Sequence, residues 1–217
     1  MTMIEPSFVS SSLASLYQDA KCTLNFSSPF QCVIAVSLSA QTTDEKVNEV
    51  TPALFKRFPT PESLSLALPS EVEPYIKSLG LYRNKAANLV GMAKALVQRY
   101  SGEVPNTLEQ LISLPGVGVK TASVVLAECF NVPAFPVDTH ISRISKRLGY
   151  AKVSDSPEAI MGKLKKRFKK DEWVKLHHRL IAFGRAICHA QSPECGICPF
   201  FGKGCKYQSK CSMSKGK

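Results

Sequence analysis

Residues 107–128 read TLEQLISLPGVGVKTASVVLAE, the most informative segment of the chain. The pattern predicts a helix that ends at Leu114, a tight turn through residues 115–118, and a second helix that begins near Lys120. Gly116 and Gly118 permit backbone angles closed to other residues, and they expose peptide N–H groups at a helix start. Together with the positive end of the helix dipole, such N–H groups bind phosphate. An ordinary helical hairpin with glycine in its turn is the plain structural alternative.

The segments before this hairpin also read as helices. Residues 29–40 are apolar almost all round, which favours a buried core helix, although their β-branched residues leave a strand open. Thr42 followed by Glu45 resembles a capping box, and Thr60 before Pro61 predicts another helix start. Residues 83–100 form a long amphipathic pattern. Short turns and the lack of an alternating strand pattern predict an all-α fold.

The charge of the chain favours a polyanionic partner. Its 217 residues hold 28 Lys and Arg against 17 Asp and Glu, which gives a net charge of +11. Each phosphate that a basic side chain neutralises releases counterions and so adds affinity for nucleic acid. A basic protein that merely stays soluble is the alternative. A basic run at residues 163–170, KLKKRFKK, is either a solvated helix face or part of a DNA-binding surface.

The sequence contains no segment of about 20 apolar residues that could cross a membrane, and its first residues do not resemble a signal peptide. We therefore expect a cytoplasmic protein, associated with the nucleoid if it binds DNA. In a reducing compartment, its eight cysteines favour metal binding or burial over disulfides. Cys22, Cys32 and Cys129 are expected to be buried or free thiols.

Four cysteines cluster near the C-terminus with the spacing C-x₆-C-x₂-C-x₆-C: Cys188, Cys195, Cys198 and Cys205. This density predicts a site for a thiophilic metal. Structural zinc sites usually contain two close cysteine pairs, and this pattern contains one. Four thiolates also suit an iron–sulfur cluster of the 4Fe-4S type.

The segments LPGVGVKTA (114–122) and VDTHISR (137–143) together resemble the helix-hairpin-helix and Gly/Pro/Asp-loop superfamily of DNA glycosylases, and within it the endonuclease III family. LNFSSPF at 24–30, LSAQTTD at 38–44, IKSLGLYRNKA at 76–86 and the C-terminal cysteines extend the resemblance, in the same order and at similar spacing. The resemblance thus covers nearly the whole chain.

The resemblance implies that Lys120 and Asp138 are the catalytic pair of a bifunctional DNA glycosylase and abasic-site lyase that removes oxidised pyrimidines. Lys120, in the first turn of a helix and partly buried, would favour the neutral amine that acts as a nucleophile. A lysine that contacts phosphate is the alternative. Asp138 precedes a helical pattern, where its structural role is that of an N-cap, and the two roles are compatible.

The resemblance also implies DNA contacts by two side chains. Gln41 would fill the gap left by a flipped nucleotide, and Leu81 would wedge against the opposite strand. Taken alone, Leu81 reads as a core residue and Gln41 as a surface residue. The hairpin residues expected to bind DNA are Gly116, Val117 and Gly118.

The expected fold has two helical lobes with the active site in the cleft between them. Residues 23–133 would form a helical barrel that carries the helix-hairpin-helix, and residues 1–22 with 134–217 would form the iron–sulfur cluster lobe. The expected partner is double-stranded DNA with damaged bases or abasic sites, bound by a monomer, with no membrane involved.

Two departures from the family pattern concern the cysteine loop. The last gap is one residue longer than the usual C-x₅-C, and Cys211 is a less favoured substitute ligand for Cys205. Residues 189–194 (HAQSPE) lack the basic residues that relatives often place there.

Two alternative functions stay open: a superfamily glycosylase for another lesion, such as mispaired adenine, and a non-catalytic helix-hairpin-helix DNA-binding module. Lys120 argues against the adenine-specific branch, which lacks this lysine. Lys120 and Asp138, which occur together in the family pattern, argue against the non-catalytic module.

Overall fold

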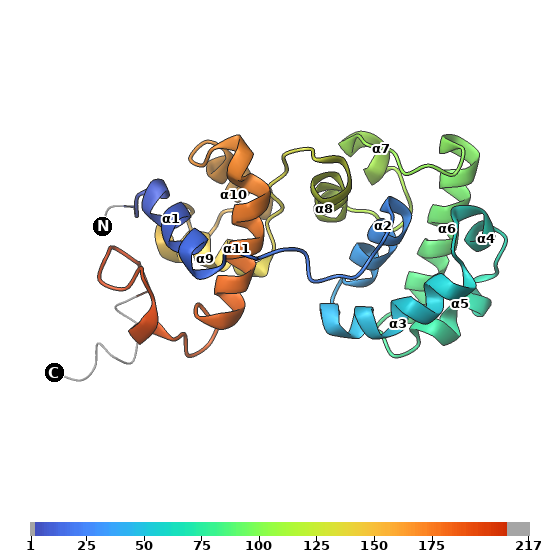
Figure 1. The fold of residues 1–217 in the computed structure, drawn as a ribbon, viewed down its shortest axis with the longest axis horizontal. Helices are drawn as coiled ribbons and strands as arrows, with labels where there is room; N and C mark the ends of the chain where they lie inside the picture. Colours follow the sequence, from blue (N-terminus) through green and yellow to red (C-terminus); the bar gives the residue numbers. More distant parts are fainter. Residues whose placement is uncertain (1–2, 208–217) are drawn as a thin grey trace. The chain divides into compact units, whose positions relative to one another are not determined.

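The computed structural model describes residues 3–207 and divides into two compact units. Residues 22–132 form one unit, here called the hairpin unit; of the described residues, 3–21 and 133–207 form the other, called the cysteine unit. Every regular element between residues 3 and 207 is a helix, as Figure 1 shows, and no strand occurs there. The predicted all-α fold is therefore confirmed.

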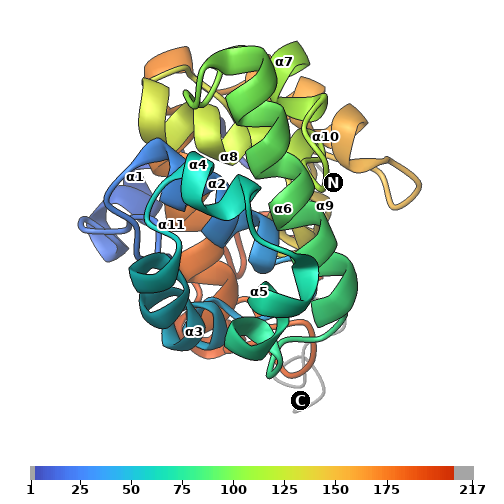
Figure 2. The same cartoon turned by 90° about the vertical axis from the view of Figure 1, so that its right-hand side faces the viewer.

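The hairpin unit is built around its longest helix. Its helices are α2 (Pro29–Leu38), α3 (Asp44–Arg57), α4 (Pro61–Ser65), α5 (Pro69–Ile76), α6 (Tyr82–Tyr100), α7 (Leu108–Ile112) and α8 (Val119–Phe130). Helices α4 and α5 pack against α6, and α8 packs against α2. Figure 2 looks onto this unit, with α6 at the front beside α4 and α5.

Helix α2 forms the centre of the hairpin unit's core. Cys32, Val33 and Ile34 are buried within it, as expected for a helix that is apolar on nearly all faces. The strand that β-branched residues left open does not form. The segment is a helix, and the side chain of Ser28 caps it by accepting a hydrogen bond from the backbone N–H of Gln31.

Two predicted helix starts have different outcomes. Thr60 caps α4 with Pro61 in the first turn, as predicted, and forms a capping box with Ser63. The predicted cap at Thr42 is wrong, because α3 is capped by Thr43, whose side chain accepts from the N–H of Lys46. The hydroxyl of Thr42 instead accepts a hydrogen bond from a lysine of α6.

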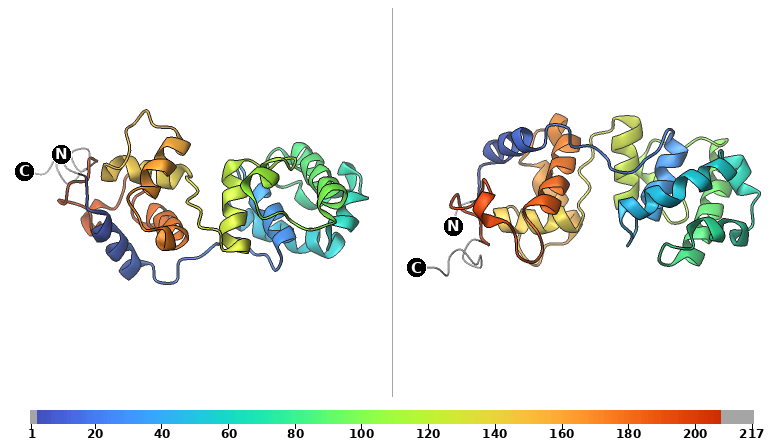
Figure 3. Two further views of the ribbon diagram at one scale, coloured as in Figure 1. Left: turned by 90° about the horizontal axis from the view of Figure 1, so that it is seen from above. Right: turned by 60° about the horizontal axis from the view of Figure 1, so that its bottom comes forward.

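The cysteine unit contains α1 (Pro6–Leu16), α9 (Thr139–Leu148), α10 (Pro157–Lys165), α11 (Trp173–Ala186) and two short 3₁₀ helices, η1 (Lys170–Glu172) and η2 (Cys195–Ile197). Helix α11 packs against both α9 and α1. In both views of Figure 3, α1 (dark blue) therefore lies with α11 (orange), although the hairpin unit separates them in the sequence.

Aromatic packing joins the cysteine-rich segment to these helices. Phe200, just after Cys198, is fully buried, and its ring meets Phe183 of α11 edge to face with 5.3 Å between centroids. Phe8 of α1 contacts the same ring at 6.1 Å. The segment is thus anchored on two helices.

In the part of the chain that the structure describes, no helix combines the length and apolar character needed to cross a membrane.

Candidate active site

The hairpin forms as predicted, with boundaries shifted by one or two residues. Helix α7 ends at Ile112, and α8 begins at Val119 with Gly118 as its N-cap. Gly116 has a φ of +76°, in the left-handed region that favours glycine. A Cβ at this position would also lie 2.9 Å from Cβ of Asn88 on α6, closer than real contacts allow. Gly116 is therefore required by its backbone angle and by its neighbour.

The N–H groups that could bind phosphate are those at the start of α8. The N–H of Val117 already donates to the carbonyl of Leu114 over 3.1 Å, so it closes the turn. The side chain of Val117 is buried. By contrast, the first N–H groups of a helix have no acceptor within the helix. The donors available to a phosphate at this helix start therefore begin at Gly118, and Val117 contributes to the shape of the turn.

Lys120 lies in the first turn of α8, as predicted, and is exposed. The partial burial expected from the sequence is therefore wrong. The side chain follows directly on a turn whose backbone is fixed by the Leu114–Val117 hydrogen bond. This position holds an amine at the positive end of a helix dipole, beside the N–H groups that can bind a phosphate.

Asp138 is the N-cap of α9. Its Oδ1 accepts a hydrogen bond from the N–H of Ile141 over 2.8 Å, and its backbone is extended. The predicted cap is thus confirmed. Because one carboxylate oxygen is held by the helix, the orientation of the whole group is fixed on a rigid element.

His140 lies two residues after Asp138 on the same helix turn. Burial lowers its pKa, and the charge of Asp138 opposes this effect, while Arg143 lowers the pKa further. A guanidinium nitrogen of Arg143 lies 3.0 Å from Nδ1 of His140 and also donates to the carbonyl of Gly184 on α11. Asp138 therefore sits beside an imidazole that favours its neutral form.

Two arginines of α9 hold the start of the cysteine loop. Arg143 Nε donates to the carbonyl of Cys188 over 3.0 Å. Arg147 is buried, and its Nη1 lies 3.2 Å from Sγ of Cys188 and 2.7 Å from the carbonyl of His189. Helix α9 thus carries Asp138 at one end and supports the first cysteine of the cluster at the other.

The four clustered cysteines offer a donor set that suits a thiophilic group. Cys188 is buried, and the other three are partly buried. Burial raises the pKa of Cys198, and the charges of Cys188 and Cys205 raise it further. A bound cation would reverse this effect on each thiol. The donors and the Arg147 contact therefore fit an iron–sulfur cluster.

The side chains are nevertheless not arranged as a ligand set. Between residues 3 and 207, no group of three or more His, Cys, Asp or Glu side chains converges as metal ligands. Cys211 lies outside the described residues. The other three cysteines match their prediction: Cys32 is buried, Cys22 and Cys129 are partly buried, and none of the three forms a disulfide.

Gln41 and Leu81 share an uncommon backbone conformation. Both have left-handed φ angles, +56° and +58°, and both side chains are exposed. Leu81 is 61% exposed, so its interpretation as a core residue is wrong. A left-handed backbone costs about 1–2 kcal/mol for a residue other than glycine, and such outliers concentrate at functional sites.

Helix α6 contacts both the end of α2 and the hairpin. These contacts were not predicted from the sequence. Leu81 is the N-cap of α6, and Lys85 in its first turns reaches the end of α2. Further along, Asn88 lies under Gly116, and a Cβ at Gly91 would lie 3.4 Å from Pro115 of the hairpin. The small residue at position 91 was the only signal of this contact in the sequence.

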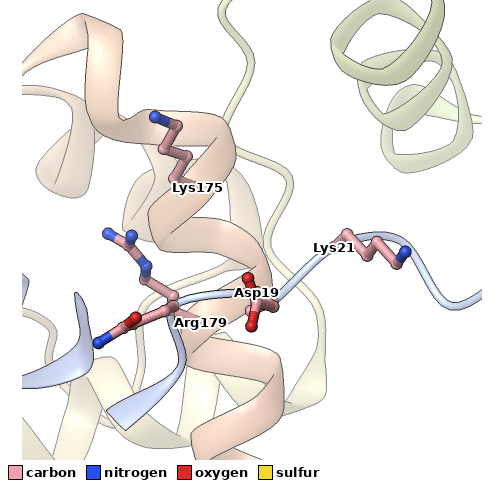
Figure 4. A pocket seen from close by; sticks show the side chains of 6 residues that line it. Asp19, Lys21, Lys175 and Arg179 are labelled. Carbon is pink, nitrogen blue, oxygen red and sulfur yellow. The ribbon is translucent and has the colours of Figure 1, made fainter. Parts of the chain in front are cut away.

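A hollow lies in the cysteine unit, and none of the predicted site residues lines it. It has a volume of about 450 Å³ and is lined by Gln18, Asp19, Ala20, Lys21, Lys175 and Arg179. Figure 4 shows Lys175 and Arg179 on one helix beside the segment that carries Asp19 and Lys21. Arg179 Nε donates to the carbonyl of Tyr17 over 3.3 Å, which fixes its stem. The lining is mainly basic, in keeping with the net charge.

An all-helical chain with a glycine hairpin, a lysine after it and a capping aspartate on the next helix defines a helix-hairpin-helix DNA-repair protein. Residues 34–170 match the HhH-GPD superfamily of base excision DNA repair proteins. The chain is 48% identical to endonuclease III of Bacillus subtilis over 188 residues, which cover 86% of this chain and 85% of that protein. It is 42% identical to endonuclease III of Escherichia coli K12, covering 86% and 88% of the two chains.

Solved structures agree. A non-covalent endonuclease III–DNA complex matches with a TM-score of 0.90 and 45% identity, over 94% of this chain and 95% of that one. The chain belongs to the endonuclease III family, and it is a DNA glycosylase and abasic-site lyase of base excision repair. A mispaired-adenine glycosylase and a non-catalytic module are therefore not favoured.

Proposed function

We propose that this base excision repair enzyme removes oxidised pyrimidines from duplex DNA through a Schiff base at Lys120. The observation that carries the proposal is the place of Lys120, exposed in the first turn of α8 directly after the hairpin. A phosphate bound by the N–H groups of that turn would hold the sugar of an adjacent nucleotide near the amine.

The first step is the loss of the damaged base. The nucleotide leaves the stack, because C1′ of its sugar cannot be reached inside the duplex. The neutral amine of Lys120 forms a bond to C1′, and the C1′–N bond to the base breaks, with its electron pair leaving on the base. Asp138 stabilises the positive charge that develops on the sugar and assists proton movement at the amine. Its carboxylate is held for this task by the N–H of Ile141.

Strand cleavage follows from the same intermediate. Opening of the sugar leaves a Schiff base between Lys120 and C1′, which acidifies the proton at C2′. Loss of this proton and departure of the 3′ phosphate break the strand by β-elimination. Water then hydrolyses the Schiff base and returns the amine.

DNA binding rests on the hairpin and on two inserted side chains. We assign the phosphate contact to the N–H groups beginning at Gly118, with Gly116 and Val117 shaping the turn. Gln41 fills the gap left by the flipped nucleotide, and Leu81 wedges against the opposite strand. Their exposure and their left-handed backbones support these assignments. The enzyme acts as a monomer, and because its substrate is chromosomal DNA, we place it in the cytoplasm at the nucleoid.

We also assign a 4Fe-4S cluster to four ligands: Cys188, Cys195, Cys198 and Cys205. The cluster would cross-link residues 188–205 and so fix the loop that they form. Arg147 would orient the first ligand through its contact with Sγ of Cys188. The longer last gap is accommodated by the exposed residues 201–203, which follow the buried anchor Phe200.

The proposal is tested with a duplex that contains a single thymine glycol. Wild-type enzyme should release the base, cut the strand, and form a covalent protein–DNA adduct when borohydride reduces the Schiff base. An undamaged duplex of the same sequence is the control. Base release without any reducible adduct would contradict the lysine mechanism, and the absence of base release would contradict the substrate class.

A further inference from the structure

A buried lysine joins the two loops that carry Gln41 and Leu81. Lys85 is 8% exposed, although lysine is almost never buried without partners. Its Nζ donates to the carbonyl of Leu38 over 2.9 Å and to Oγ1 of Thr42 over 2.7 Å. Neither partner is a carboxylate, so the buried charge is met by neutral oxygens alone. Burying a charge costs free energy, so we expect Lys85 to have a role that offsets this cost.

The two partners of Lys85 bracket the turn that contains Gln41. Leu38 is the last residue of α2, where backbone carbonyls lack partners within the helix and a positive charge is favoured. Thr42 follows Gln41 directly, and its hydroxyl donates to the carbonyl of Ala40 over 3.4 Å. Lys85 therefore binds the turn at both ends, at Leu38 and at Thr42. The Thr42 hydroxyl in turn binds the carbonyl of Ala40 inside the turn.

Lys85 is also tied to the other loop. Its backbone N–H donates to the carbonyl of Leu81 over 3.0 Å, within the first turn of α6. Gln41 and Leu81 are both in the left-handed region, which persists only where the surroundings enforce it. One residue thus contacts both strained loops, through its side chain on one side and its backbone on the other.

We propose that Lys85 is a positioning residue that holds the Gln41 and Leu81 loops in a fixed relation, so that both side chains enter the duplex together. The inference rests on the proposed function of these two side chains. Because the loops are ordered before DNA binds, little conformational entropy is lost on insertion. Without this link, each side chain would insert separately, and the nucleotide would be extruded less often.

The test uses a pair of variants matched at one atom. Thr42→Val removes the hydroxyl that Lys85 contacts and keeps the side-chain shape, whereas Thr42→Ser keeps the hydroxyl. Lys85→Met keeps the apolar stem and removes the side-chain donors. The readout is the fluorescence of 2-aminopurine placed next to a tetrahydrofuran abasic-site analogue, which rises when its stacking is lost. Single-turnover excision of thymine glycol and the affinity for undamaged duplex are measured alongside.

We expect Thr42→Val and Lys85→Met to lose most of the fluorescence rise and to excise about tenfold more slowly or worse, as misplaced groups do. Their affinity for undamaged duplex and their circular dichroism should match the wild type, and Thr42→Ser should behave as the wild type. If Lys85→Met fails to fold, the Thr42 pair decides. A Thr42→Val enzyme with full fluorescence and excision overturns the inference, and so does a Thr42→Ser enzyme as impaired as Thr42→Val.

Failure of the proposed function gives a different result. A wild-type enzyme that neither unstacks the probe nor excises thymine glycol would refute the proposed function itself. If Leu81→Ala abolishes the fluorescence rise while Lys85→Met and Thr42→Val retain it, the wedge is real and only the role of Lys85 is refuted.

Discussion

Arg147 donates from Nη1 to Sγ of Cys188 over 3.2 Å, and the same guanidinium donates to the carbonyls of His189 and Ala190. The guanidinium also lies over the ring of Tyr207, with its Cζ 3.8 Å from the ring centroid. Arg147 therefore links the first proposed cluster ligand to α9, the helix that Asp138 caps.

Replacing Arg147 with methionine should loosen the cluster loop. The variant loses the hydrogen bond to Sγ of Cys188, and it leaves the carbonyls of His189 and Ala190 without the donor that Arg147 supplies. We expect less iron per protein and faster loss of the absorbance near about 400 nm that thiolate-bound iron–sulfur centres show. Lys146→Met, which removes the same charge from the preceding residue, is the matched control. Equal iron content in both variants would contradict the role given to Arg147.

The ligand set can be tested by exchanging sulfur for oxygen. Cys198→Ser should abolish the brown colour and the iron content after anaerobic purification, because a hydroxyl is a poor ligand for iron in such a cluster. Cys211→Ser should leave both unchanged. A colourless wild-type protein with one zinc and no iron would overturn the assignment, whereas loss of colour in Cys211→Ser would show that the longer gap had shifted the last ligand.

The two glycines of the hairpin should respond differently to alanine. Gly116→Ala places a methyl group 2.9 Å from Cβ of Asn88 at a φ of +76°, so we expect a loss of unfolding free energy of roughly 1–3 kcal/mol. Gly118→Ala meets no protein atom within 4 Å and has a φ of −92°, so its urea midpoint should stay near that of the wild type.

The same pair tests the phosphate site. Gly116→Ala should weaken binding to undamaged duplexes of any sequence, because the distorted turn misplaces the N–H groups of α8. Wild-type affinity should fall steeply with salt, as several phosphate contacts require. Equal stability of the two variants, or an affinity independent of salt, would be inconsistent with this account.

His140 reports the charge of Asp138 without any measurement of activity. Burial lowers the pKa of His140 and the Asp138 carboxylate raises it, so Asp138→Asn should lower this pKa further. Proton NMR of the imidazole during a pH titration measures the shift. Asp155→Asn is the control, because the Asp155 carboxylate pairs with Lys163. This variant should leave the pKa of His140 unchanged.

The lowered pKa of His140 also determines how the free energy of unfolding changes with pH. The unfolded chain binds a proton at higher pH than the folded chain does, so this contribution to stability is present above the ordinary histidine pKa. It is lost as the pH falls from that value through the folded pKa. Replacing His140 with glutamine should therefore flatten the fall in urea midpoint over this range.

Much of the fold could be predicted because local signals agreed with it. A nearly continuous apolar segment located α2, an amphipathic pattern located α6, Thr60 with Pro61 located α4, and the glycines located the hairpin. Asp138 was predicted as a cap from its position before the pattern of α9, and the structure confirms it. These signals act over a few residues, so a sequence reveals them directly.

The features that were missed depend on contacts between distant segments. The cap at Thr42 was assigned wrongly because Lys85, 43 residues away, takes its hydroxyl. Lys120 was expected to be partly buried, yet exposure depends on tertiary packing, and the lysine is exposed. Nothing in the local sequence indicated that Arg147 would reach Cys188 or that Asn88 would lie under Gly116.

The division of labour between Lys120 and Asp138 gives the sharpest prediction. Lys120→Gln removes the nucleophile from an exposed position, so it should abolish borohydride trapping and leave DNA binding and stability nearly unchanged. Lys94→Gln, which removes an exposed positive charge from α6, is the matched control and should trap like the wild type. An adduct that still forms with Lys120→Gln would place the nucleophile elsewhere and refute the proposed mechanism.

Asp138→Asn separates the structural role of the carboxylate from its charge. The amide oxygen can still accept from the N–H of Ile141, so α9 should stay capped and the thermal midpoint should change little. The negative charge that opposes the developing positive sugar is gone, however, and excision of thymine glycol should fall by ~10²-fold or more. Single-turnover rates measure this loss apart from binding. Because cap and charge are tested independently, excision at the wild-type rate would leave Asp138 with the role of a helix cap alone.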